Sequence, residues 1–430
     1  MQTPKVLSLS VALLALALAG CSVPAGAGAS NTGTPGSGTP DGGTTGDGHG
    51  AIAGASEVAE PQLHLLTIDP AGATTMLDLA DESAKEAGTL AETDSISTDG
   101  RYIFASSADA GTLTILDSGT WTWDHEDHFH YYRSSSRLVG TVEGDGPAVV
   151  APGSARTGVF FPETGEGMLL DNAGLAKGEV RRTVELAGEP HQGMVVPLGD
   201  FALATVPGTD GTANGTAGSV QVHDGSGTAV PGAVQACPDA RGTITTAVGV
   251  VIGCADGAAL ATVKDGAVGF EHIPYPEGAV TGPAAEARAS VFRAREGRPT
   301  VAAVAGTEGA WLLNTRKRAW QLIRTDVPLL QVSAVDDKKG HVVALSADGR
   351  VLVLSAETGE TLSATEPLLP ETVADPELLA GVELVTDQQR AYLNAPAEQK
   401  LYEIDFADGG RLARTFPTPA VPEFFTVTGR

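Results

Sequence analysis

A stretch of thirteen residues, from Trp121 to Arg133, carries the densest set of chemically active side chains in the sequence. It reads WTWDHEDHFHYYR and holds three of the chain's nine histidines, three acidic residues and five aromatic side chains. Imidazole nitrogens are borderline ligands that suit Zn²⁺, with Cu²⁺ and Ni²⁺ as competitors. The candidate ligands of such a metal site are Asp124, His125, Asp127, His128 and His130.

The spacing of the three histidines decides whether they can meet at one ion. In an extended segment, His128 and His130 point to the same side of the chain. A turn at Glu126-Asp127 would bring His125 round to join them, and a flanking carboxylate would add an oxygen ligand or orient a ring from outside. The alternative interpretation is an exposed loop that is rich in histidine and aspartate and binds no metal.

The segments around this stretch predict an all-β domain built from one repeated unit. Short runs of Val, Ile, Leu, Ala and Thr alternate with Gly, Asp, Asn and Pro turns, as in SISTDGRYIFASSADAGTLTILDSGT and SAVDDKKGHVVALSADGRVLVLSAETGE. Seven units are countable, and their second strands begin near Arg101, Thr157, Asp200, Gly249, Thr300, His341 and Arg390. The mean spacing of about 48 residues is the period of a four-stranded propeller blade. Only SAKEAGTLAE is a candidate for a turn or two of helix.

Both ends of the folded part hold partial units, which predict how the repeat is completed. LHLLTID and TTMLDLA near the start read as two outer strands, and EFFTVTG at the end reads as an inner strand. A blade shared between the termini removes sheet edges that would otherwise stay unpaired. We therefore predict a single β-propeller of eight four-stranded blades, closed by pairing of the N- and C-terminal strands. Seven blades with looser linkers is the alternative, while a tandem β-sandwich would not explain the single period.

The position of the histidine-rich stretch follows from this repeat. It falls where the third strand of a blade should run into the fourth, so we expect it to form a long loop between these strands. A propeller is a rigid scaffold and does not by itself imply any reaction.

The first 57 residues read as export and anchoring segments. Residues 1–20 combine Lys5, a short apolar run and the ending Leu-Ala-Gly before Cys21, which is the pattern of a bacterial lipoprotein signal and predicts lipidation of Cys21. Residues 21–57 then carry the lipid and a Gly/Ser/Thr/Pro-rich tether with too few large apolar residues to fold, and residues 58–430 form the propeller. The protein is thus expected at the outer face of the cytoplasmic membrane. An ordinary secretory signal with an incidental cysteine is the alternative.

Two cysteines remain once Cys21 is set aside. They are Cys237 and Cys254, and an even pair in an exported protein predicts a disulfide. A Cys–Cys metal pair is the alternative, although no further ligand lies near these cysteines in the sequence.

The composition argues against several classes of function. With 27 basic and 53 acidic residues, the net charge of −26 argues against binding nucleic acid or anionic lipid headgroups. The sequence holds no nucleophile elbow, no zinc-protease motif, no P-loop and no dinucleotide fingerprint. Paired carboxylates leave a hydrolase as an alternative, but four Trp and six Tyr are few for a sugar-binding cleft. We therefore expect that the protein is not an enzyme.

Several stretches share their order and spacing with one known family. They are TLTILDSGTWTWDHEDHFHYYR, FFPETGEGMLLDNAGL, GEPHQGMVVPLGD, ACPDARG with GCADG, HIPYPEG and GRVLVLSAETGE. Over roughly residues 60 to 430 the chain resembles the AztD family of extracytoplasmic zinc-binding β-propellers. The resemblance implies Zn²⁺ as the bound ion and a metallochaperone role. The expected partner is the solute-binding protein of a zinc ABC transporter, to which the ion is passed.

The resemblance carries over two stretches that hold histidines. The family's His/Asp-rich loop matches residues 124–130, and its Pro-His-His-Gly motif matches residues 190–193, which adds His191 to the candidate ligands. Taken alone, His191 is more typical of a packed or solvated polar residue.

Two other family histidines are missing from this chain. Arg241 stands at one of these positions, and residues 147–150 lack the other. A cation such as Arg241 would oppose zinc binding by charge repulsion. The resemblance therefore places the expected coordination on the loop rather than in the channel. A propeller scaffold that binds another envelope protein without any metal is the alternative function.

Overall fold

A computed structural model describes residues 52–124, 128–208, 215–279 and 284–430. These residues belong to one compact unit. The predicted signal peptide, Cys21 and most of the predicted tether lie outside the described residues, as do His125 and Asp127, so the lipid anchor stays a prediction. Within the described ranges, no helix is long and apolar enough to cross a bilayer.

The described residues form nine antiparallel sheets, of which eight follow one another around the domain and are numbered as blades 1 to 8. The strands of each blade are given from the inner to the outer one. Blade 1 has β34 (Phe424–Thr428), β2 (His64–Ile68), β3 (Ala73–Asp78) and β4 (Ala84–Thr89), and blade 2 has β5 (Ser95–Thr98), β6 (Tyr102–Ser107), β7 (Thr112–Asp117) and β10 (Arg137–Glu143). Blade 3 has β11 (Val149–Ala151), β12 (Arg156–Phe161), β13 (Glu166–Asp171) and β14 (Arg182–Leu186), and blade 4 has β15 (Val195–Leu198), β16 (Phe201–Pro207), β17 (Ala217–His223) and β18 (Ala229–Ala236).

Blades 5 to 8 continue the same pattern. Blade 5 has β19 (Thr243–Thr245), β20 (Val250–Cys254), β21 (Gly257–Lys264) and β22 (Ala267–Pro274), and blade 6 has β23 (Thr300–Val304), β24 (Gly309–Asn314) and β25 (Ala319–Arg324). Blade 7 has β26 (Leu329–Ala334), β27 (His341–Ser346), β28 (Val351–Ser355) and β29 (Thr361–Ala364), and blade 8 has β30 (Leu384–Thr386), β31 (Ala391–Ala395), β32 (Lys400–Asp405) and β33 (Arg411–Pro417). The seven predicted second strands each begin within one residue of the predicted position, which confirms the repeat.

The prediction of eight four-stranded blades is wrong for blade 6, which has three strands in the described residues. The segment where its inner strand was expected divides its backbone hydrogen bonds between two sheets. Arg293 exchanges two bonds with Ala302 of β23, while Ala334 of β26 donates to Arg293 and accepts from Arg295. Because the segment serves both neighbours, it forms isolated bridges rather than a strand.

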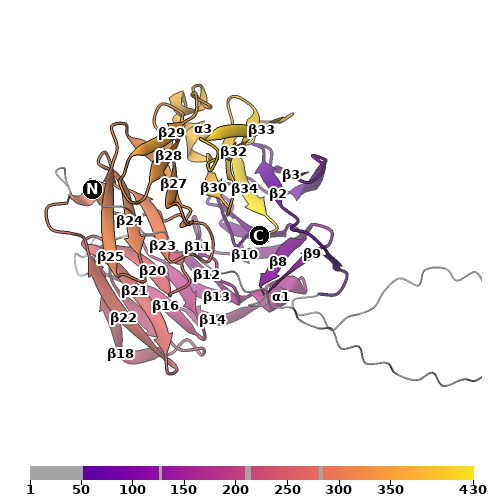
Figure 1. The fold of residues 1–430 in the computed structure, drawn as a ribbon. Helices are drawn as coiled ribbons and strands as arrows, with labels where there is room; N and C mark the ends of the chain where they lie inside the picture. Colours follow the sequence, from indigo (N-terminus) through magenta and orange to yellow (C-terminus); the bar gives the residue numbers. More distant parts are fainter. Residues whose placement is uncertain (1–51, 125–127, 209–214, 280–283) are drawn as a thin grey trace, which may run out of the picture. The chain divides into compact units, whose positions relative to one another are not determined.

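The two ends of the domain meet in blade 1. Strand β34 pairs with β2 over five residues, from His64 opposite Thr428 to Ile68 opposite Phe424. Figure 1 shows this C-terminal strand, in yellow, beside the indigo strands of the N-terminal end. EFFTVTG therefore forms an inner strand, as predicted. SAKEAGTLAE does not form a helix but contributes the outer strand β4, because its backbone completes the edge of β3.

The core lies between neighbouring sheets. One cluster of buried apolar side chains fills each of the successive interfaces, and a further cluster joins blade 8 to blade 1. Each cluster draws members from two neighbouring sheets, such as Leu66 of blade 1 and Ile103 of blade 2, or Leu203 of blade 4 and Ile252 of blade 5. Each fully buried side chain of this size contributes about 2 kcal/mol through the hydrophobic effect, which makes the sheets a rigid support for the loops between them.

Four short helices occur in the described residues: α1 (Asn172–Ala176), α2 (Ala284–Ala287), the 3₁₀ helix η1 (Thr372–Ala374) and α3 (Pro376–Ala380). Asp171 begins α1 as its N-cap and accepts a hydrogen bond from the backbone of Ala173. Asp375 caps α3 in the same way, with Pro376 in the first turn.

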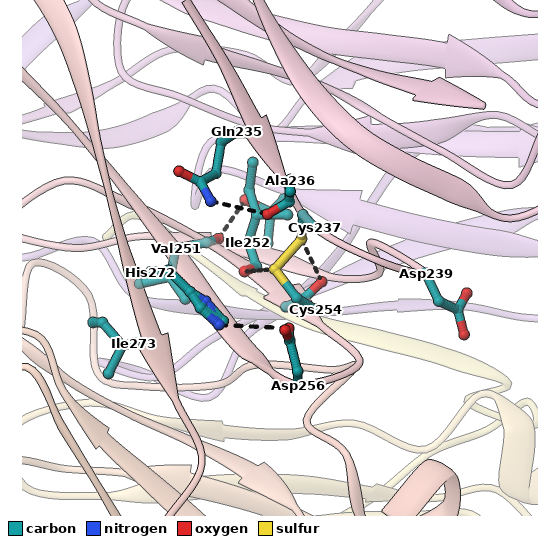
Figure 2. The surroundings of a disulfide bond; sticks show 12 residues. Gln235, Ala236, Cys237, Asp239, Val251, Ile252, Cys254, Asp256, His272 and Ile273 are labelled. Carbon is teal, nitrogen blue, oxygen red and sulfur yellow. Dashed lines mark hydrogen bonds and ion pairs between the residues drawn. A yellow bond between two sulfur atoms is a disulfide. The ribbon is translucent and has the colours of Figure 1, made fainter. Parts of the chain in front are cut away.

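The predicted disulfide is confirmed. Cys237 and Cys254 are bonded and fully buried in the cluster between blades 4 and 5. Figure 2 shows the bond with His272 and Asp256 beside it, whose side chains are 3.5 Å apart. The alternative of a Cys–Cys metal pair is therefore wrong.

Candidate metal centre

The histidine-rich stretch forms a hairpin rather than the expected loop. Strands β8 (Thr120–Asp124) and β9 (Phe129–Arg133) pair with each other, and β1 (Ser56–Val58) adds to the free edge of β9. As predicted, the histidine-rich stretch lies between the third strand β7 and the fourth strand β10 of blade 2. The aromatic residues of both strands and the threonines of β8 have high β propensity, which explains why the segment pairs instead of remaining irregular.

A tight turn sets the base of the hairpin. Gly119 adopts a φ of 76°, and a Cβ atom built there would lie 2.6 Å from the carbonyl oxygen of Ser134. Only glycine fits such a close approach in this conformation. At the same base, the backbone of Thr122 donates to the carbonyl of Arg430, and its hydroxyl donates to Gly429. The hairpin is thus fastened to the end of the chain that leaves β34 (Figure 1).

The structure brings two of the predicted ligands together. The ring centroids of His128 and His130 lie 4.6 Å apart, with an angle of 59° between the ring planes. His128 is exposed, whereas His130 is half-buried. Asp124 ends β8 opposite Phe129, at the same tip of the hairpin. His125 and Asp127 lie outside the described residues, so their role stays a prediction.

Glu57 is a part of this site that sequence reasoning missed. Its Oε1 atom lies 2.6 Å from Nδ1 of His130, although the two residues are 73 positions apart in the chain. No spacing pattern in the sequence could have indicated this contact, since it arises from the pairing of β1 with β9. Glu57 stood within the predicted tether, where a carboxylate is expected to be solvated.

A run of stacked side chains holds the hairpin against blade 2. His130 stacks at 6.3 Å from Tyr132, which in turn stacks at 5.2 Å from Trp121. The guanidinium of Arg101 lies 3.8 Å from the Trp121 ring centroid. Arg101 also forms two hydrogen bonds, of 2.9 and 2.8 Å, with the buried carboxylate of Asp117. The position of the histidine rings is thereby tied to the rigid part of the fold.

The pKa shifts of Tyr132 and Arg101 agree with this arrangement. Burial and the nearby Glu57 carboxylate raise the pKa of Tyr132 above its usual range. Burial alone would lower the pKa of Arg101, but the hydrogen bonds and charge of Asp117 outweigh it and raise that pKa. Arg101 therefore stays charged beneath Trp121.

His191, the remaining predicted ligand, is buried and has both ring nitrogens engaged in contacts with other residues. It is buried, with Nδ1 2.8 Å from the carbonyl oxygen of Glu189 and Nε2 2.8 Å from the hydroxyl of Thr205. Its ring also meets Phe160 edge-on at 4.9 Å. Both ring nitrogens have protein partners, so a metal would have to displace one of them. Its proposed ligand role stays a prediction.

The described inner strands enclose a cavity of about 450 Å³. Its lining includes Ser97 of β5, Thr386 of β30 and the paired side chains of Arg293 and Glu383, whose hydrogen bonds are 2.7 and 2.6 Å long. None of the lining residues is a histidine. Arg241, which the resemblance places at a family histidine position, donates a hydrogen bond of 3.1 Å to Asp239.

In the part of the chain that the structure describes, no group of three His, Cys, Asp or Glu side chains is arranged to hold a metal ion. In the described residues, the candidate site on the hairpin therefore consists of the imidazoles of His128 and His130, and Glu57 contacts Nδ1 of His130. Any further ligand from the predicted set at its tip would come from residues 124–127.

Comparison with curated sequences finds a relative that matches part of this chain. The zinc chaperone AztD of Citrobacter koseri is 26% identical over 187 residues, which cover 42% of this chain and 44% of the relative's length. Two solved structures of Citrobacter koseri AztD, one of them the apo form, superpose with a TM-score of 0.73. This chain is a homologue of the zinc chaperone AztD.

The comparison with the AztD structures covers 86% of this chain and 98% of each solved chain, at 19% identity, so it supports the shared fold. No protein-family model matches the sequence. The relative is named a zinc chaperone and not an enzyme.

Proposed function

We propose that this protein is an exported zinc chaperone that binds Zn²⁺ at the tip of the β8–β9 hairpin. His128 and His130 are the proposed core of the site. His125, Asp124 and Asp127 complete the proposed ligand set, and His191 is a further candidate that would have to exchange its present hydrogen bonds. The zinc ion is cargo in this proposal, so no covalent chemistry is required of the protein.

The observation that carries the proposal is the juxtaposition of two imidazoles on an exposed hairpin in a homologue of a zinc chaperone. Zinc favours such nitrogen ligands and accepts carboxylate oxygen as well. The proposed site is on the exposed hairpin, since the lining of the cavity between the blades contains no histidine.

The exposure of the hairpin suits transfer by ligand exchange. Because His128 is exposed, an incoming ligand from another protein can approach the ion and displace one imidazole at a time. The half-buried His130, fixed by Tyr132 and Glu57, would be the last to release it. A site that closed fully around the ion would hold zinc but would release it slowly.

The proposed setting follows from the export signal and the fold. A lipid on Cys21 and a tether to residue 57 would hold a ring of eight blades at the outer face of the cytoplasmic membrane. The buried disulfide supports an oxidising compartment. The proposed partner is the solute-binding protein of a zinc ABC transporter.

The test compares three proteins in a zinc competition titration with a chromophoric chelator. The variant His128→Ala/His130→Ala should bind zinc at least about 100-fold more weakly than the wild type, because it loses two ligands. The variant His223→Ala/His272→Ala removes two imidazoles elsewhere and should bind like the wild type. Equal zinc binding by all three proteins, or no binding by the wild type, would show the proposal to be wrong.

A second candidate function rests on the exposure of two aromatic side chains beside the histidines. Trp123 is 45% exposed and Phe129 is 55% exposed, and aromatic residues are enriched in protein interfaces. The hairpin would then be an epitope for another envelope protein without any metal. Elemental analysis of protein purified without added metal separates the two: bound zinc supports the chaperone, and its absence together with metal-independent binding of a partner supports the scaffold.

A further inference from the structure

Strand β1 places a carboxylate next to the zinc hairpin. Ser56 pairs with Arg133, Glu57 with Tyr132 and Val58 with Tyr131. Side chains alternate between the two faces of a strand, so Glu57 lies on the same face as Tyr132 and as His130 two residues earlier. Diagonal neighbours on one face of a sheet are within reach of long side chains, and the 2.6 Å contact between Glu57 and His130 is of this kind.

The contact decides which nitrogen of His130 carries the proton. A carboxylate accepts hydrogen bonds and cannot donate one when ionised, so Nδ1 of His130 must be the donor. In the neutral ring, a proton on Nδ1 puts the lone pair on Nε2. Because Tyr132 stacks on one side of the ring and Glu57 holds Nδ1, the ring is also fixed in direction.

We propose that Glu57 is a positioning residue of the zinc site, which fixes His130 in the tautomer that binds the ion through Nε2. This inference rests on the function proposed above and deepens it. A carboxylate behind a ligating imidazole raises the basicity of the ring and orients it, and loss of such a partner typically weakens metal binding by about 10- to 100-fold. Glu57 is not itself a ligand, since it lies on the Nδ1 side of the ring.

The location of Glu57 adds a consequence for the predicted tether. The strand that presents it, Ser56–Val58, has three residues and overlaps the end of the segment predicted to lead to the lipid anchor. The zinc site therefore includes the point where the chain enters the folded domain, and full affinity requires β1 to stay paired with β9.

The test uses the full-length protein with Glu57→Ala, Glu57→Gln and the control Glu60→Gln. Glu60 is an exposed carboxylate three residues further along the chain. In the zinc competition titration, Glu57→Ala should bind about tenfold more weakly than the wild type. Glu57→Gln should fall between them, because its amide oxygen still accepts the Nδ1 proton without the negative charge. Glu60→Gln should bind like the wild type.

A second measurement reads the tautomer without any metal. Nitrogen-15 NMR of the histidine rings in the apo protein should show His130 protonated on Nδ1 in the wild type. In Glu57→Ala the proton should shift toward Nε2. A general structural role for Glu57 would not produce this shift.

The outcomes separate this inference from the proposed function. Histidine-dependent zinc binding that is equally tight in Glu57→Ala, or an unchanged tautomer in that variant, would overturn the role of Glu57 alone. Absence of zinc binding in the wild type would overturn the proposed function and this inference with it. Weaker binding together with the tautomer shift would support both.

Discussion

Arg101 joins blade 2 to the β8–β9 hairpin, and its replacement by methionine should destabilise the protein. In the native protein its guanidinium bonds twice to Asp117 and lies over Trp121. Methionine keeps most of the apolar volume of the side chain but removes the charge and both donors. Asp117, which is 1% exposed, would then remain as a buried carboxylate with a weaker set of partners.

The magnitude follows from what Asp117 retains. Removing one member of a buried ion pair costs about 3–5 kcal/mol when the other is left uncompensated. Asp117 would keep the hydrogen bond from the backbone of Gly119, and Arg137 lies 3.6 Å away. These contacts reduce the loss, while the lost cation–π contact with Trp121 adds about 1 kcal/mol. We expect the free energy of unfolding to fall by about 3 kcal/mol.

The assay is urea unfolding followed by tryptophan fluorescence, with two comparison variants. Arg137→Met removes a cation that is 41% exposed and should cost only about 1 kcal/mol. The double variant Arg101→Met/Asp117→Asn should cost less than the sum of the two single variants, because its second substitution removes the uncompensated charge. A loss below about 1 kcal/mol for Arg101→Met, or strictly additive losses in the double variant, would refute the reasoning.

Two further predictions concern stability. Burial raises the pKa of Asp99 to about 6, so this carboxyl stabilises the fold most at low pH and loses that contribution as the pH rises through 6. The shift corresponds to at most about 3 kcal/mol. Because the side chain is only partly buried, the advantage of Asp99→Asn over wild type should grow by about 1 kcal/mol between about pH 4 and pH 7 in unfolding measurements. A constant difference would contradict this. Replacing Cys237 and Cys254 by alanine should lower the free energy of unfolding by about 3 kcal/mol, because the disulfide joins residues 17 positions apart and so restricts the unfolded chain. Urea unfolding of this variant and of the chemically reduced wild type should agree, and an unchanged midpoint in either would contradict it.

The elements that the sequence predicted well are those determined by local patterns. Alternation of apolar and polar residues and the glycine turns located the seven second strands to within one residue. The cysteine count and the export signal were enough to predict the pair Cys237–Cys254. The position of the histidine-rich stretch, between the third and fourth strands of a blade, also followed from the period.

The elements that the sequence did not predict depend on neighbours that are distant in the chain. A four-stranded blade 6 needs an inner strand before Thr300, but Arg293 in that segment hydrogen-bonds to both Ala302 and Ala334 of the adjacent blade, and only the packing of two sheets decides that division. SAKEAGTLAE became a strand because the edge of β3 was available to it.

The sequence by itself determined the repeat, the disulfide pair and the presence of several zinc-type donors within one short stretch, because each depends on residues that are close in the chain or on simple counts. Only the tertiary structure decided that His130 meets Glu57, since strand pairing brings together residues 73 positions apart. It also decided that His191 is engaged by Thr205 in the core. The physical reason is the same in both cases: the hydrogen-bond partners of an imidazole are set by which strands lie side by side, and spacing along the chain does not encode that.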